Sequence, residues 1–209
     1  MFPLLILAAG ASSRMRGDDK LAMTIDGVSL LRRQVIAGIA AGARVHVALR
    51  PDDPRAALLD GLDVARFEIA ASAEGMGATL REGVARLPRA RRFGLMPADL
   101  PDLDASAIAR VFDAAAREDG TLVWRGASAV GRPGHPVVCD AALRPRFMTL
   151  SGASGGRAVL APYGPRTRLV RLPGVIATHD LDTPESWAEW RMEKGRRDMA
   201  LRPHGIKTN

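Results

Sequence analysis

Residues 4–21 read LLILAAGASSRMRGDDKL, and this stretch decides the fold class. The apolar run Leu4–Ala9 predicts a buried strand, which ends at Gly10 in a loop that carries Arg14 and Lys20. In open α/β sheets, ligands bind in the loops beyond the carboxyl ends of the parallel strands. A buried strand that runs into a Gly/Ser/Arg/Lys loop therefore predicts an α/β protein with a phosphate site at this edge.

The loop matches neither of two common phosphate-binding loops. A dinucleotide-binding turn needs G-x-G-x-x-G, but only Gly10 lies at this turn. A P-loop needs four residues between its glycines, but six separate Gly10 from Gly17 here, and two aspartates precede Lys20. Gly10 still allows a ligand close to the backbone, and Arg14 and Lys20 are suited to phosphate oxygens. These residues alone leave open an ordinary surface loop with solvated side chains.

Short apolar runs alternate with helical periodicity along the rest of the chain. We expect strands at residues 44–49, 64–70, 92–96, 121–124, 166–172 and 175–180. We expect helices at 29–42, 77–87, 104–118 and 140–148, and a last helix that begins at Pro184. Residues 126–138, rich in glycine and proline, predict a break. The alternation predicts a single Rossmann-like domain, with three α/β/α layers around a doubly wound, mainly parallel sheet.

The composition excludes several classes of protein. The chain has 209 residues and a formal net charge of +7, but residues 191–209 hold six lysines and arginines against two acidic residues. We therefore divide the chain into a domain at 1–190 and a basic C-terminal tail at 191–209. With one tyrosine and one cysteine, Cys139, it lacks an aromatic and basic nucleic-acid platform and an internal disulfide. No apolar run could span a membrane, so we expect a cytoplasmic protein without nucleic-acid or membrane partners.

Five segments carry a family resemblance. The first is LAAG-x-S-x-R-M with Lys20 shortly after it, which resembles the signature of the nucleotide-diphospho-sugar transferase superfamily. The others are EGMGATLREGV (74–84), MPADLPDL (96–103), GHPVV (134–138) and DLDTPESW (180–187). In this order they resemble the MobA-like NTP transferases, and above all the molybdenum cofactor cytidylyltransferases. The resemblance implies a nucleotidyltransferase that moves CMP from CTP to the phosphate of molybdopterin and releases pyrophosphate.

The resemblance also implies a nucleotide site around the first loop. Its expected residues are Leu7, Ala8, Ala9, Gly10, Ser12, Arg14, Lys20, Gly75 and Met76. Arg14 and Lys20, on an exposed loop, are expected to be catalytic because they would offset charge on the leaving pyrophosphate. Guanylyltransferases of this branch tend to carry glycine at the position of Ala9. The methyl group of Ala9 therefore favours CTP over GTP.

Three aspartates are candidates for a Mg²⁺ site. Asp99, the third expected catalytic residue, follows a predicted strand and stands between Pro97 and Pro101. Asp180 and Asp182 lie on one side of an extended segment because side chains alternate there. The resemblance implies that Asp99 and Asp182 bind the metal and that Asp180 supports them. Asp99 could instead be an ordinary turn or cap aspartate, and Asp182 a local turn residue before the last helix.

The identity of the acceptor is less constrained. The resemblance places His135 and Arg157 on the acceptor side, although a turn histidine satisfied by the backbone is equally open. Ala153 stands where the family usually carries an acidic residue. Alternatives are therefore a nucleotidyltransferase that uses GTP or a sugar phosphate, and a non-catalytic factor that binds or inserts the molybdenum cofactor. A molybdoenzyme of the xanthine dehydrogenase type is an implied partner.

Overall fold

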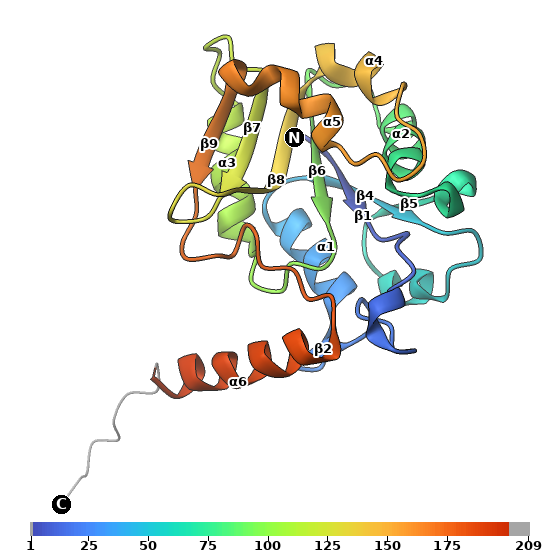
Figure 1. The fold of residues 1–209 in the computed structure, drawn as a ribbon, viewed down its shortest axis with the longest axis vertical. Helices are drawn as coiled ribbons and strands as arrows, with labels where there is room; N and C mark the ends of the chain where they lie inside the picture. Colours follow the sequence, from blue (N-terminus) through green and yellow to red (C-terminus); the bar gives the residue numbers. More distant parts are fainter. Residues whose placement is uncertain (1, 201–209) are drawn as a thin grey trace, which may run out of the picture.

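A seven-stranded sheet forms the centre of the protein in a computed structural model that describes residues 2–200 (Figure 1). Its strand order is β5-β4-β1-β6-β8-β7-β9, and only β8 runs antiparallel to its neighbours. The strands are β1 (Pro3–Leu7), β4 (Arg44–Leu49), β5 (Ala65–Glu68), β6 (Arg92–Pro97), β7 (Val123–Ala127), β8 (Pro133–Asp140) and β9 (Thr167–Arg171). The parallel strands therefore place their carboxyl ends along one edge.

Helices cover both faces of this sheet. Side chains alternate along β1, so Leu4 and Ile6 enter one core and Leu5 enters the other. The first core contains α1 (Leu30–Ala40) and α3 (Ala105–Ala115); the second contains α2 (Met76–Arg86), α4 (Arg144–Phe147) and α5 (Arg157–Leu160). The expected three-layer α/β/α fold with a mainly parallel sheet is confirmed. No helix in the described part of the chain is long and apolar enough to cross a membrane.

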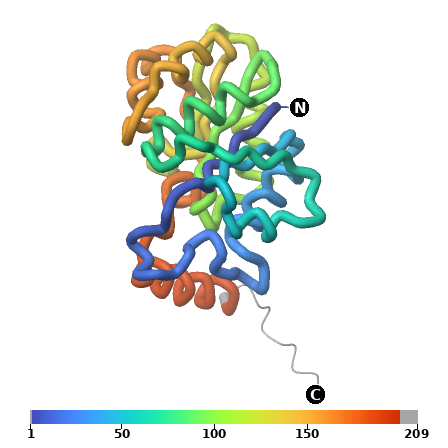
Figure 2. The backbone as a smooth tube through the Cα atoms, turned by 90° about the vertical axis from the view of Figure 1, so that its right-hand side faces the viewer, coloured from blue at the N-terminus to red at the C-terminus, as the bar shows by residue number. Residues whose placement is uncertain are grey.

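The last helix, α6 (Pro184–Ala200), lies below the carboxyl edge of the sheet (Figures 1 and 2). Trp187 and Trp190 attach it to the core on the α1 side, with their rings 6.0 Å apart. The helix passes through residue 190 without a break, so the division into a domain and a tail remains a prediction. The end of the expected tail, 201–209, lies outside the described residues.

The expected break at 126–138 is wrong, because most of it is strand. β7 continues to Ala127, and β8 begins at Pro133 and runs between β6 and β7. Two prolines and one glycine obscured β8, since proline is rare inside sheets and glycine weakens a strand. A glycine is also needed in the neighbouring β7: a Cβ on Gly126 would lie 2.2 Å from the carbonyl oxygen of His135. The backbones of β7 and β8 therefore pass too close together at this point for a side chain on Gly126.

Two smaller differences also concern short segments. The strand expected at 175–180 is absent, and the chain forms turns there before it reaches α6. A small hairpin, β2 (Thr24–Ile25) with β3 (Val28–Ser29), precedes α1 and was not predicted. Its strands are too short to show a period in the sequence. The other expected helices and strands are present, with ends that differ by a few residues.

Candidate active site

Three segments converge at the carboxyl edge of the sheet. The loop after β1 carries Arg14 and Lys20, and the loop after β6 carries Asp99. The chain returns to this edge between β9 and α6, where the N–H of Leu181 donates to the carbonyl oxygen of Asp99 at 3.1 Å. This bond places residues 180–182 beside the loop after β6. Predicted site residues from distant parts of the sequence therefore meet at one place.

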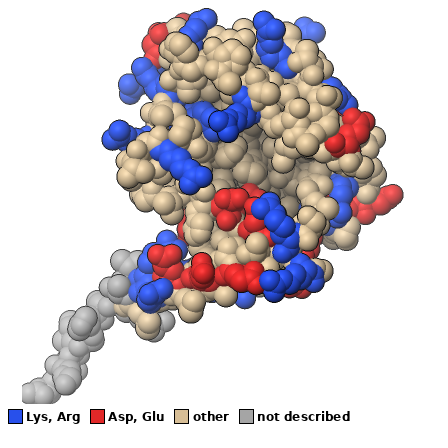
Figure 3. All heavy atoms as spheres, viewed as in Figure 1, with Lys and Arg blue, Asp and Glu red and all other residues tan. Residues whose placement is uncertain are grey.

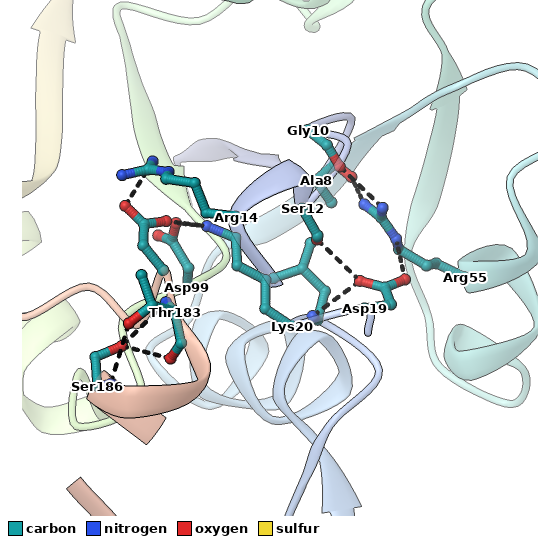
Figure 4. A network of polar contacts seen from close by, with 12 residues as sticks. Ala8, Gly10, Ser12, Arg14, Asp19, Lys20, Arg55, Asp99, Thr183 and Ser186 are labelled. Carbon is teal, nitrogen blue, oxygen red and sulfur yellow. Dashed lines mark hydrogen bonds and ion pairs between the residues drawn. The ribbon is translucent and has the colours of Figure 1, made fainter. Parts of the chain in front are cut away.

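The Lys20 ammonium lies between two of the predicted carboxylates (Figure 4). Its Nζ donates to Oδ2 of Asp99 at 2.5 Å and to Oδ1 of Asp182 at 2.6 Å. Oδ2 of Asp182 pairs with Nη2 of Arg14 at 2.7 Å. Burial disfavours the charge on Lys20, but the two carboxylates outweigh burial and raise the pKa of Lys20. The expectation of an exposed Lys20 is wrong, since its side chain is only 13% exposed.

Asp180 and Asp182 hold protons with different affinities. Burial raises the pKa of Asp180, and the neighbouring carboxylates of Asp182 and Asp99 raise it further. Burial also disfavours the charge on Asp182, but its bond to Lys20 and the positive charges nearby outweigh burial and lower the pKa of Asp182. Asp182 therefore favours the ionised form that a metal ligand needs, whereas the carboxyl group of Asp180 beside it favours the protonated form.

The free oxygen atoms decide whether a divalent cation fits here. Oδ1 of Asp99 is buried and has no hydrogen-bond partner within residues 2–200. Such an oxygen atom is costly to leave unpaired, and a hard cation would satisfy it. Within the same range, no three His, Cys, Asp or Glu side chains form a metal site by themselves. The residues fit a Mg²⁺ ion that Asp99 and Asp182 would share with phosphate oxygens and water.

The loop after β1 is held on both sides. Ser12 has a left-handed backbone with φ of 51°, and its Oγ donates to Oδ1 of Asp19 at 3.2 Å. A buried arginine, Arg55, donates to the carbonyl oxygens of Ala8 and Gly10. Arg55 was not predicted as a site residue, because no motif or periodicity marks it as buried. Arg55, which lies 45 residues beyond Gly10 in the sequence, therefore supports the loop that carries the predicted nucleotide residues.

The beginning of α2 packs against the segment 151–154. The N–H of Gly77 donates to the carbonyl oxygen of Gly152 at 2.9 Å. Gly75 has φ of 121°, and a Cβ there would lie 2.7 Å from the same oxygen. A side chain at Gly75 would therefore push the two segments apart. Met76 is 44% exposed and lines the adjoining cavity.

A cavity of about 580 Å³ opens at the carboxyl edge of the sheet, where it is lined by Leu7 at the end of β1 and Pro97 at the end of β6. Leu7 and Met76, expected to bind nucleotide, line it together with His135 and Arg157, expected to bind the acceptor. A second cavity, of about 260 Å³, shares His135 and reaches Asp99. Figure 3 shows a hollow on this face, with acidic side chains below it and basic side chains above it. Members of the two predicted groups thus line one cavity, whereas the other predicted nucleotide residues line neither cavity: Ala8, Ala9, Gly10, Ser12, Arg14, Lys20 and Gly75.

Two further arginines line these cavities and were not predicted. Arg125 and Arg132 line both of them. Burial lowers the pKa of Arg125, and the charge of Arg157 lowers it further. Within the described residues, the guanidinium of Arg125 donates only to the carbonyl oxygen of Gly134, at 3.3 Å. Neither arginine lies in a motif. Arg125 belongs to β7 and Arg132 directly precedes β8, so their place in the site depends on stretches of strand that the sequence did not predict.

His135 occupies the beginning of β8. Because β8 is antiparallel, this end of the strand lies at the same edge as the end of β6. Gly134 permits the approach of the chain after β9: a Cβ there would lie 2.0 Å from the carbonyl oxygen of Ala177, which accepts the N–H of His135 at 2.8 Å. Burial lowers the pKa of His135 to about 4, so the ring is neutral at pH 7.

The low pKa of His135 predicts a loss of stability in acid. An unfolded histidine titrates near pH 6.5, so below that pH the unfolded chain binds a proton that the folded chain binds only near pH 4. Unfolding free energy should therefore fall by up to about 1.4 kcal/mol per pH unit between those values. The measurement is urea unfolding of the unaltered chain and of His135→Gln from pH 7.5 to 4.5. A constant difference between the two proteins across this range would contradict the assignment.

The family comparison agrees with the fold. The MobA-like NTP transferase domain matches residues 4–169. No curated protein matches the chain. The match includes the loop after β1, Asp99, His135 and Arg157, and it ends before Asp182.

Solved structures show the same architecture. The crystal structure of Rv0371c from Mycobacterium tuberculosis H37Rv is 26% identical, with a TM-score of 0.74 over 90% of this chain and 97% of that chain. A complex of Rv0371c with manganese is 23% identical, with a TM-score of 0.68 over 90% and 96%. A CMP:2-keto-3-deoxy-manno-octonic acid synthetase complexed with CTP is 14% identical, with a TM-score of 0.71 over 94% and 100%. The chain therefore belongs to the MobA-like NTP transferase domain family of nucleotidyltransferases.

Proposed function

We propose that the chain transfers CMP from CTP to the phosphate of molybdopterin, with Mg²⁺ as its cofactor. The observation that carries this proposal is the position of Lys20 between Asp99 and Asp182, at the end of the loop after β1. Such a cluster suits a reaction that brings two polyanions together, because positioning and charge neutralisation supply most of the catalysis. The manganese bound to Rv0371c and the CTP bound to the sugar-acid synthetase support the metal and the nucleotide.

The chemistry is an in-line displacement at phosphorus. An acceptor phosphate oxygen attacks the α-phosphorus of CTP, and the bond to the α,β-bridging oxygen breaks, so pyrophosphate leaves with the electron pair. A bound Mg²⁺ ion supplies charge neutralisation between the two polyanions. Asp99 and Asp182 would hold this ion, with Asp180 in support. Arg14 and Lys20 bind triphosphate oxygen atoms and offset the charge on the leaving group.

The lining of the larger cavity supports a pterin acceptor. Its walls are largely apolar, which suits a flat ring better than a sugar with many hydroxyl groups; they include Leu80, Leu95, Val137 and Leu160. Arg125, Arg132 and Arg157 add the positive charge that an anionic acceptor needs. Neutral His135 offers an unpaired Nδ1 for a hydrogen bond.

The choice of base rests on the loop after β1. Leu7, Ala8 and Ala9 lie at the end of β1, and Ala9 is 8% exposed. Its methyl group reduces the room beside the base, which favours the smaller cytosine over guanine. Gly10, Ser12, Gly75 and Met76 complete the proposed nucleotide site. We further propose a cytoplasmic location and delivery of the product to a molybdoenzyme of the xanthine dehydrogenase type.

Pyrophosphate release tests the nucleotide and the acceptor together. The purified chain is supplied with Mg²⁺ and with CTP, GTP, ATP or UTP, each with molybdopterin, with a hexose phosphate or without acceptor. We expect release only with CTP and molybdopterin. Release with GTP would overturn the choice of base, and release with the sugar phosphate would overturn the acceptor. Tight binding of molybdopterin without release in any mixture would favour a non-catalytic carrier.

A further inference from the structure

Arg55 makes an unusual set of contacts behind the nucleotide loop. It lies in a short 3₁₀ helix, η2 (Pro54–Leu59), which follows β4, and its side chain is 2% exposed. Its Nη2 donates to the carbonyl oxygen of Gly10 at 2.8 Å, and its Nη1 donates to that of Ala8. Its Nε donates to Oδ2 of Asp19 at 2.6 Å (Figure 4). One guanidinium therefore joins the beginning of the loop to its end.

The acidic partners of Arg55 hold it in this position. Asp19 also accepts the Oγ–H of Ser12 at 3.2 Å and the N–H of Leu21 at 3.0 Å, so it closes the loop upon itself. On the other side, Oδ1 of Asp53 accepts the N–H of Arg55 at 3.1 Å. Burial disfavours the charge on Asp53, but bonds from Arg50 and Arg55 outweigh it and lower the pKa. Nε of Arg55 also lies 3.6 Å from Oδ1 of Asp53, so the guanidinium is held between two carboxylates.

The contacts of Arg55 determine the direction of the loop amides. In a trans peptide the carbonyl and the following N–H point to opposite sides. The carbonyl groups of Ala8 and Gly10 face Arg55, so the N–H groups of Ala9 and Ala11 point away from it. The order of strands gives the same result. The N–H of Ala8 donates to the carbonyl oxygen of Ala48 in β4, on the side of Arg55, whereas the carbonyl oxygen of Leu7 accepts the N–H of Ala98 after β6.

The N–H groups of Ala9 and Ala11 make no hydrogen bond to another group within residues 2–200. Free N–H groups of a loop that point to the same side form a site for an anion. The side to which they point is the side of β6 and Asp99, where the triphosphate is proposed to lie. Arg55 thus acts on the nucleotide through the backbone and does not touch it.

We propose that Arg55 is a positioning residue that holds the loop after β1 with the N–H groups of Ala9 and Ala11 directed at the triphosphate. This inference rests on the proposed function only because it requires that the chain bind a nucleoside triphosphate. It holds whether the base is cytosine or guanine. A lysine cannot replace Arg55, because its single ammonium does not match three acceptors arranged around a planar fork. Loss of the fork should therefore weaken triphosphate binding even where the fold is kept.

The test is the affinity for CTP, GTP and inorganic tripolyphosphate, measured by calorimetry with Mg²⁺ on the full chain. Arg55→Lys and Arg55→Met should each bind the preferred ligand about 10-fold or more weakly. In turnover they should raise the KM for the nucleotide, with little change in kcat or in the KM for the acceptor. A general loss of structure would lower kcat and the active fraction instead.

Arg92→Met is the matched control. Arg92 is also buried, donates its Nη2 to the carbonyl oxygen of Arg117 at 3.0 Å, and stacks on Trp124, away from the nucleotide loop. This variant should lose stability but keep its triphosphate affinity within about twofold. If Arg55→Met does not fold, Asp19→Asn gives a milder version of the same change and should weaken binding in the same direction.

Separate outcomes test the inference and the proposed function. Unchanged affinity in Arg55→Lys, or in Asp19→Asn where Arg55→Met does not fold, would overturn the role of Arg55. So would an unaltered chain that binds none of the three ligands. A chain that prefers GTP, and loses GTP affinity in Arg55→Lys, would overturn the choice of cytosine while it supports the role of Arg55.

Discussion

Asp99→Asn should lower the rate of CMP transfer by about 100-fold or more, with little change in the fold. The amide keeps the shape of the side chain but loses the charge that attracts a divalent cation. Its oxygen can still accept the Lys20 ammonium, so the contact between the loops after β1 and β6 survives. The loss should persist at saturating CTP because it concerns the chemical step. The measurement is pyrophosphate release against Mg²⁺ concentration, with circular dichroism to check the fold.

Asp102→Asn is the control for the Asp99 substitution. Asp102 lies in the same loop, but its carboxylate accepts Nε1 of Trp190 at 2.9 Å and pairs with Arg197 at 3.3 Å. Its loss should weaken the attachment of α6 without changing the Mg²⁺ dependence of the rate. Normal turnover in Asp99→Asn with an unchanged Mg²⁺ requirement would remove Asp99 from the metal site. An equal loss of rate in both variants would assign the effect to the loop as a whole.

The fold could be predicted where its signals are local. The strand Leu4–Ala9 and the helix periodicities needed only neighbouring residues, and these elements are present in the structure. β8 could not be recognised, because Pro133 and Pro136 oppose a strand and only the backbone packed against Gly134 explains its glycine. The contacts that decide β8 come from β7 and from the chain after β9, which no local pattern reveals.

In the candidate site, too, residues that lie in local motifs could be predicted, whereas contacts between distant segments could not. Arg14, Lys20, Asp99 and Asp182 could be proposed because they lie in motifs. Their ion pairs could not, since they span up to 168 residues from Arg14 to Asp182. The burial of Lys20 depends on the return of the chain to the carboxyl edge. Arg55 and Arg125 had no signal of their own, because arginine is usually exposed and its burial depends on distant carbonyl groups.

Lys20→Met should abolish most turnover and make the protein depend on a divalent cation for stability. In the unaltered chain, the Lys20 ammonium lies between the largely buried carboxylates of Asp99 and Asp182 and pairs with both. Methionine fills a similar volume without charge and leaves the two carboxylates facing each other. We expect the variant, in EDTA, to lose about 2 kcal/mol of unfolding free energy, or roughly 5 °C in melting temperature.

A divalent cation should restore the contribution of Lys20 to stability but not its contribution to turnover. Mg²⁺ or Mn²⁺ can take the place of the ammonium between Asp99 and Asp182, so either ion should raise the melting temperature of Lys20→Met more than that of the unaltered chain. Turnover should stay about 100-fold or more below normal, because the ion does not replace the charge that Lys20 brings to the triphosphate. Thermal melting with titrated metal and pyrophosphate release measure the two effects.

Lys194→Met is the control for the Lys20 substitution. Lys194 also pairs with two aspartates, Asp26 and Asp198, but at the surface of α6 and far along the chain from the nucleotide loop. It should show neither metal-dependent stabilisation nor a loss of turnover. If Lys20→Met responds to Mn²⁺ no more than Lys194→Met does, then Asp99 and Asp182 do not share a cation. Near-normal turnover in Lys20→Met would show that the triphosphate is held without Lys20.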